Sequence, residues 1–176
     1  IIQDLPCPYE VFDTNLWQTE WSRIIAKYYQ VIPNGEFFWQ MARRNLEWWR
    51  VNRDYERGSR ARYYDNFCLA LGLTKDTLRG KIVGEIGAGP FGGLINHIQP
   101  EHNQAVFVDV LANAQRVLRF INWPANSVFI DSPLERIALP DKAVDVMLSY
   151  NAMDHGWNVR AGLDEIARTS KECFIA

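Results

Sequence analysis

Several classes of protein are excluded by what this 176-residue sequence lacks. It holds only three cysteines, Cys7, Cys68 and Cys173, an odd number without metal-site spacing, so we expect reduced, buried thiols and no metal site. No run approaches about 18 consecutive apolar residues, and the N-terminal stretch lacks the layout of a signal peptide. The formal net charge of −2 gives no general attraction to nucleic acid. We therefore expect a cytoplasmic protein that does not contact a membrane, and a nucleic-acid partner is disfavoured.

The N-terminal half, residues 1–79, is predicted to be helical. Apolar residues recur there at steps of three and four, as in Trp17, Trp21, Ile24 and Tyr28. Gly58-Ser59 is expected to break this half. A last helix, which runs through Tyr63, Phe67, Leu69 and Leu71, is then expected to end near Gly72.

From residue 80 onward the hydrophobic period changes. Short runs rich in β-branched residues follow one another, separated by segments long enough for helices: "KIVGEI", "AVFVDV", "SVFI", "VDVMLS" and "CFIA". This alternation predicts an α/β domain over residues 80–176, with a mainly parallel sheet covered by helices on both faces.

The stretch "EIGAGPFGG", residues 85–93, follows the first predicted strand and has Gly-x-Gly-x-x-Gly spacing. In such a turn the first glycine permits the sharp bend and the second lets a ligand approach the backbone. Asp109, near the end of the second predicted strand, stands 17 residues after Gly92. A carboxylate there can accept both hydroxyls of a ribose, or it can simply cap the next helix. These two features suit a nicotinamide dinucleotide as well as another nucleoside cofactor.

A third region of the sequence distinguishes between a nicotinamide dinucleotide and another nucleoside cofactor. "SPLERIALPDKAVDVMLSYNAMDH", residues 132–155, closely resembles the fourth-strand region of class I S-adenosylmethionine-dependent methyltransferases. The acid and glycines of "EIGAG" resemble the family's first motif, and "AGLDEIARTSK" resembles its following helix. The resemblance covers about residues 80–176. It implies a Rossmann-like, doubly wound sheet that binds S-adenosylmethionine, preceded by residues 1–79 as a lid that recognises the substrate. It also implies that further C-terminal strands are missing, so we expect the sequence to be part of a longer polypeptide.

The resemblance implies a set of cofactor-binding residues: Glu85, Gly87, Ala88, Gly89, Asp109, Val110, Leu134, Glu135 and Asn151. The backbone of residues 87–89 would line the methionine part, and Glu85 would orient its amino-acid end unless it is purely a structural turn acid. Asp109 would bind the ribose.

At the adenine, the resemblance implies packing by Val110 with Leu111 and a backbone donor at Leu134. The family's aspartate for the adenine amino group aligns with Pro133. Either Glu135 or Asp131 is therefore expected to reach that amine, or packing alone holds the ring.

For the reaction, Tyr150 or Asn151 would face the sulfonium, and the candidate catalytic residues are His155, Asp154 and Tyr150. A lone histidine after a strand is also compatible with a structural hydrogen bond. "SYNA", residues 149–152, differs from the Asn/Asp-Pro-Pro-aromatic motif of DNA base-amine methyltransferases.

We therefore expect methyl transfer to a small-molecule acceptor, ahead of a protein or RNA acceptor. The alternatives are a non-catalytic S-adenosylmethionine-binding module in regulation or assembly and, third, a dehydrogenase.

Overall fold

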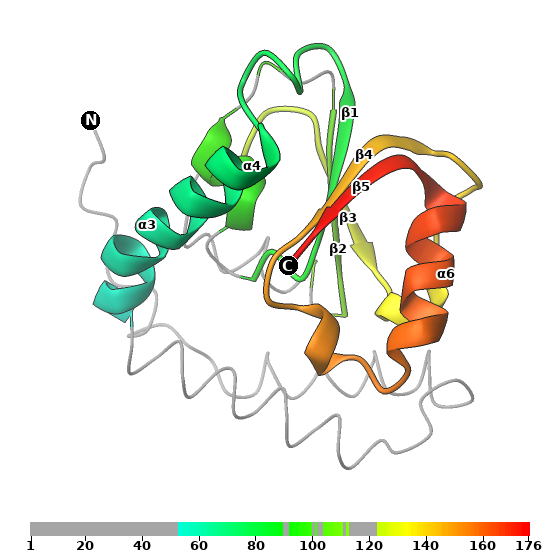
Figure 1. Ribbon diagram of the computed structural model, residues 1–176. Helices are drawn as coiled ribbons and strands as arrows, with labels where there is room; N and C mark the ends of the chain where they lie inside the picture. Colours follow the sequence, from blue (N-terminus) through cyan, green and yellow to red (C-terminus); the bar gives the residue numbers. More distant parts are fainter. Residues whose placement is uncertain (1–52, 90–91, 100, 102–103, 111, 113–122) are drawn as a thin grey trace.

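The computed structural model describes residues 53–89, 92–99, 101, 104–110, 112 and 123–176, with side chains from residue 61 onward (Figure 1). The helices predicted before residue 53, including the stripe around Trp17, lie outside the described residues. Within the described part, no helix is both long and apolar enough to cross a bilayer.

The described elements are five strands interspersed with α-helices and short 3-10 helices. In order they are α3 (Arg53–Leu71), β1 (Ile82–Ile86), α4 (Gly93–Ile98), β2 (Gln104–Asp109), β3 (Ser127–Asp131), η1 (Leu134–Arg136), β4 (Val144–Ser149), η2 (Met153–His155), α6 (Val159–Thr169) and β5 (Ser170–Ile175). The five strands form one sheet in the order β3-β2-β1-β4-β5, and every pairing is parallel. The predicted α/β sheet is confirmed, and each of the five apolar runs forms a strand.

Alternate residues of the strands serve two separate cores. One core lies under α3 and α4 and takes Val83, Ala105, Phe107, Val146 and Leu148 from the sheet. The other lies under α6 and η1 and takes Ile86, Val106, Val108 and Met147. Helices thus cover both faces of the sheet, with α3 and α4 on one side and α6 on the other (Figure 1). Because both faces are covered, the strands read as nearly continuous apolar runs.

Helix α3 differs from the prediction in one respect. It runs from Arg53 to Leu71 without a break at Gly58-Ser59, so the predicted break is wrong. A glycine within a helix costs only about 1 kcal/mol relative to alanine, and tertiary packing readily offsets that cost.

The predicted helix through Tyr63 and Phe67 is confirmed, and it ends at Leu71, next to Gly72. The side chains that enter the core are Tyr64, Phe67 and Cys68, at steps of three and one, whereas Tyr63 is 50% exposed and Leu69 is 84% exposed. Among the two described cysteines, Cys68 is buried as expected, but Cys173 is exposed.

The strand order places a topological switch point beside β1. The chain proceeds from β1 outward to β2 and β3, and then returns to the other side of β1 to build β4 and β5. In open parallel sheets of this kind, ligands bind outside the carboxyl ends of the strands at the switch point. The candidate site is therefore the edge where β1, β2 and β4 end.

Candidate functional site

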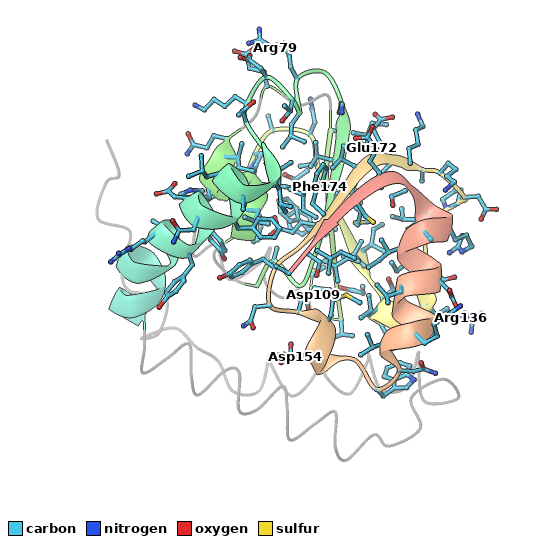
Figure 2. The ribbon with its side chains drawn as sticks, in the orientation of Figure 1. Arg79, Asp109, Arg136, Asp154, Glu172 and Phe174 are labelled. Carbon is cyan, nitrogen blue, oxygen red and sulfur yellow. The ribbon has the colours of Figure 1, made fainter. Side chains whose placement is uncertain are left out.

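Most of the predicted site residues meet at the carboxyl edge of the sheet. Asp109 ends β2, the glycine turn follows β1, and residues 150–155 follow β4. Figure 2 shows Asp109 and Asp154 at the same end of the molecule, while Arg79, which precedes β1, lies at the opposite end. The tertiary structure thus brings together three segments that are far apart in the sequence.

The glycine turn has the backbone that its sequence predicts. Gly87 has a φ of 66° and Gly89 a φ of 65°, values in the left-handed region that glycine adopts at low cost. The amide of Gly87 donates to the carbonyl of Val108 at 3.0 Å, which fastens the turn to β2. A Cβ at Gly87 would lie 2.4 Å from the Cβ of Ala152. Glycine is therefore required at residue 87 both by its φ and by the close approach of the loop after β4.

Glu85 is buried beneath this turn, with only 2% of its surface exposed. Its two carboxylate oxygens accept from the amides of Leu94 at 2.7 Å and Ile95 at 2.8 Å. A Cβ at Gly93 would lie 1.9 Å from the nearer oxygen, so Gly93 makes room for the carboxylate. Glu85 therefore joins β1 to the start of α4. Its contact with the amino-acid end of a cofactor stays a prediction.

Asp109 and Asp131 lie side by side at the ends of β2 and β3, where the ladder pairs their Cα atoms. Asp109 is half-buried and Asp131 is 5% exposed. The carbonyl of Asp109 accepts from the amide of Ser132 at 3.3 Å, which holds the start of the next segment against β2. Val110 follows at the same edge and is half-buried. Leu111 lies outside the described residues.

The segment after β3 packs against α6. Leu134 is 9% exposed and belongs to the core under α6. The carboxylate of Glu135 accepts from the amide of Asn158, immediately before α6, at 2.9 Å. Burial raises the pKa of Glu135. The nearby backbone amides of Asn158, Trp157 and Glu135 itself act in the opposite direction on this pKa, because they favour the charged carboxylate. The predicted contacts of Leu134 and Glu135 with adenine stay predictions.

The two residues predicted to face the sulfonium differ in their surroundings. The Tyr150 ring lies edge-on against Tyr64 and Phe67 of α3, with centroids 5.3 Å away in both cases. Asn151 is exposed and has a φ of 54°, and its amide donates to the carbonyl of Ala176 at 2.7 Å. Tyr150 therefore builds the wall between the carboxyl edge and α3, while Asn151 lies at the surface of the edge.

Asp154 and His155 form part of η2 at the surface. Their side chains are 72% and 41% exposed, and His155 Nε2 lies 3.9 Å from Asp154 Oδ1. Within the described ranges, no group of three or more histidine, cysteine or acidic side chains is arranged to hold a metal ion.

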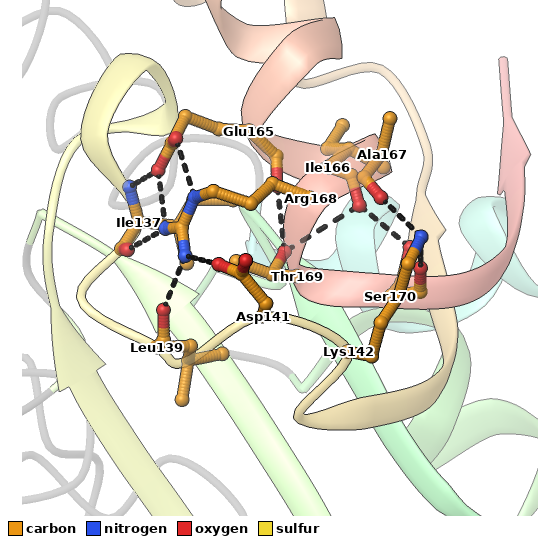
Figure 3. A network of polar contacts seen from close by, with 10 residues as sticks. All are labelled: Ile137, Leu139, Asp141, Lys142, Glu165, Ile166, Ala167, Arg168, Thr169 and Ser170. Carbon is orange, nitrogen blue, oxygen red and sulfur yellow. Dashed lines mark hydrogen bonds and ion pairs between the residues drawn. The ribbon is translucent and has the colours of Figure 1, made fainter.

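The sequence reasoning missed a clamp on the α6 side of the sheet (Figure 3). The Arg168 guanidinium donates to the carbonyls of Ile137 and Leu139, each at 2.8 Å. It also pairs with Glu165 at 2.7 Å and with Asp141 at 2.8 Å, and both partners raise its pKa further. Arg168 thereby ties the segment between η1 and β4 to α6. The only signal in the sequence was an arginine three residues after an acid on a predicted helix.

Comparisons with known proteins agree with this architecture. No family model matches the sequence, and no curated protein matches it. Solved structures do match. A provisionally named methyltransferase from Bacillus halodurans superposes with a TM-score of 0.51 at 20% identity, covering 61% of this chain and 47% of that one. A second one, from an antibiotic biosynthesis pathway of Anabaena variabilis, gives 0.50 at 22% identity, with 62% and 41% covered.

The chain has the fold of class I S-adenosylmethionine-dependent methyltransferases. The resemblance read from the sequence is thus confirmed at the level of the fold. The [4+2]-cyclase SpnF shares this fold, with a TM-score of 0.50, 17% identity, and 63% of this chain and 41% of that chain covered. The chain therefore spans less than half the length of these three structures. At such identities the methyltransferase fold is established, but the reaction is not.

Proposed function

We propose that this chain binds S-adenosylmethionine at the carboxyl edge and transfers its methyl group to a small-molecule acceptor. One observation carries the proposal. A glycine turn with left-handed backbone lies at the switch point of an all-parallel β3-β2-β1-β4-β5 sheet, with Asp109 ending the neighbouring strand. That arrangement supports a nucleoside cofactor, with Asp109 as the proposed acceptor for its ribose.

The residues present fit this cofactor. Residues 87–89 offer main chain to its methionine part, and the half-buried Asp109 is the proposed partner of the ribose diol. Leu134 and Val110 border the place for adenine, and Pro133 offers no acceptor side chain to its amine. Asp131, beside Asp109, is the acid of this edge that could supply that acceptor, since Glu135 already accepts from the amide of Asn158.

The cofactor supplies an electrophilic methyl group on a sulfonium. The chain's part is to hold the acceptor in line with that group and to exclude water, and such positioning can contribute about 7–11 kcal/mol. Asn151 and the wall formed by Tyr150 border the acceptor's place. If the acceptor carries a proton, His155 with Asp154 would remove it, and a base of this kind contributes about 10²–10⁴-fold. We expect residues 1–79 to close over this edge.

The first test is calorimetric titration with S-adenosylmethionine and with its demethylated product. We expect both to bind, and Asp109→Ala to weaken both at least about tenfold, because a ribose diol loses two hydrogen bonds. Asp76→Asn is the matched control, since Asp76 pairs with Arg79 at the opposite end of the sheet. Equal binding by Asp109→Ala would overturn the ribose assignment, and preferential binding of a nicotinamide dinucleotide would overturn the cofactor.

The second test measures formation of the demethylated product against a library of small-molecule acceptors. We expect turnover with at least one of them, and a loss on the order of 10²-fold in kcat for His155→Asn if the acceptor is protonated. Because SpnF shares this fold and is named a cyclase, the fold does not decide the chemistry. Tight binding without turnover across the library would favour a binding module.

A further inference from the structure

Two glycines on the α6 side make room for the segment after β3. A Cβ at Gly162, within α6, would lie 2.5 Å from Leu134 Cγ. A Cβ at Gly156, in the loop before α6, would lie 2.7 Å from Glu135 Oε1. Gly156 has a φ of −75°, which any residue adopts. It is therefore space for Glu135, rather than backbone freedom, that favours glycine at this position.

The Glu135 carboxylate is an unusual connection. Oε1 accepts from the amide of Asn158 at 2.9 Å, whereas Oε2 is enclosed and has no hydrogen-bond partner among the described residues. Enclosing a carboxylate oxygen without a donor costs free energy. The carboxylate therefore links η1 to the loop before α6 at some cost to stability, and such an unpaired oxygen calls for an explanation.

The loop that Glu135 holds is the one that covers the glycine turn. It begins at Asn151, two residues after the end of β4, and places Ala152 against Gly87. It then carries η2 and reaches Asn158 at the start of α6. Its first residue is tied to Ala176, and its last residue is tied to Glu135. A displacement at Asn158 would therefore be passed to Ala152, which packs directly against Gly87.

We propose that Glu135 is a positioning residue that holds the loop of residues 151–158 against the glycine turn and so sets cofactor affinity without touching the cofactor. The part concerning affinity rests on the function proposed above. This role differs from direct contact with the adenine amine, which the sequence resemblance had left open for the same residue.

The loop-holding part is tested on the full chain without any ligand, by hydrogen exchange with mass spectrometry. We expect Glu135→Ala to speed exchange in residues 152–158 about tenfold and to leave β1 and β4 unchanged, because only the local opening becomes easier. Glu135→Gln keeps an acceptor for Asn158 and should stay within about twofold of the parent. Glu172→Gln, an exposed change on β5, is the matched control.

Gly156→Ala supplies an independent variant. Its added Cβ should displace the Glu135 carboxylate and reproduce the faster exchange, yet it should add no more than about twofold in a Glu135→Ala background. Fully additive effects, or unchanged exchange in Glu135→Ala, would overturn the loop-holding role. Faster exchange spread over β1 and β4 would show a merely structural effect and would overturn it as well.

The affinity part is tested by calorimetry with S-adenosylmethionine and with an analogue that lacks the adenine amino group. A positioning role predicts that Glu135→Ala weakens both by the same factor, about tenfold, and that Glu135→Gln restores both. If Glu135→Ala weakens the binding of S-adenosylmethionine but not that of the analogue, Glu135 contacts the adenine amine directly, and the proposal is overturned. If the parent chain binds neither molecule, the proposed function fails, while the exchange experiment still decides the loop.

Discussion

The two faces of the sheet each carry a carboxylate that occupies space left by a glycine. Glu85 fills the space at Gly93 on the α4 face, and Glu135 fills the space at Gly156 on the α6 face. Both acids accept from backbone amides at the start of a helix. Glu85 uses both oxygens, at 2.7 and 2.8 Å, whereas Glu135 uses one, at 2.9 Å.

The difference separates a fixed connection from an adjustable one. A buried acceptor whose oxygens are all paired makes its neighbourhood costly to disturb, because every displacement leaves donors and acceptors unpaired. A half-paired carboxylate loses less on moving. We therefore expect the α4 side of the site to be rigid, and the loop on the α6 side to be the part that responds to substitution and ligand.

The largest expected effect is that of Gly93→Ala. Its Cβ would meet the Glu85 carboxylate at 1.9 Å, and its φ of 50° is strained for alanine, so we expect a loss of about 3–5 kcal/mol in the free energy of unfolding, measured in urea. Gly72→Ala is the matched control. Gly72 has a φ of 63° but no atom within 4 Å of an added Cβ, so only the strain of about 1 kcal/mol remains. Equal losses would show that Glu85 is not held rigidly.

A smaller loss is expected from Arg168→Met, which tests whether the α6 face depends on its clamp. The change removes the Arg168 donor from the Leu139 carbonyl, and it removes one of two donors from both the Ile137 carbonyl and Glu165 Oε2. We expect a loss of about 2–3 kcal/mol in the same urea experiment. Arg160→Met removes an exposed pair with Asp164 and should cost less than about 0.5 kcal/mol. Similar values for the two variants would contradict the clamp.

The smallest effects are expected in how stability depends on pH. The contributions of Glu135 and Glu165 to the free energy of unfolding should change with pH in opposite directions. Burial raises the pKa of Glu135 above its ordinary 4.5, so the parent should lose stability relative to Glu135→Gln as pH rises from about 4.5 through that raised value. Arg168 lowers the pKa of Glu165, so its contribution should be present above about 4.5 and vanish as pH falls through the lowered value. Urea midpoints between pH 3 and pH 8 measure both. If the contributions of Glu135 and Glu165 to stability changed with pH in the same direction, the proposed difference between the two carboxylates would be contradicted.

Much of the fold could be predicted because it depends on local patterns. Short β-branched runs specify strands, and the spacing of the glycines in residues 87–92 specifies a turn between a strand and a helix. The predicted helix break at Gly58-Ser59 failed because propensity is weak beside packing: α3 gains more from its core contacts through Tyr64 and Phe67 than a glycine costs.

The candidate site could be predicted as a set of segments but not as a set of contacts. The sequence marked Asp109 and the loop after β4, and the structure places them at one edge. The sequence did not show that Tyr150 turns toward α3, because its aromatic partners Tyr64 and Phe67 are more than 80 residues away along the chain. Arg168 was missed as a clamp for a similar reason, since its carbonyl partners lie 29 and 31 residues before it.

The sequence by itself determined the parallel sheet, the glycine turn at the end of its first strand and the acids near that turn, because periodicity and backbone freedom are properties of neighbouring residues. Only the tertiary structure decided which of those acids are engaged by the protein's own amides. Glu85 binds amides 9 and 10 residues away, and Glu135 binds one 23 residues away. Such distances along the chain are closed only when sheet and helices pack, so the difference between the two carboxylates is a property of the folded protein.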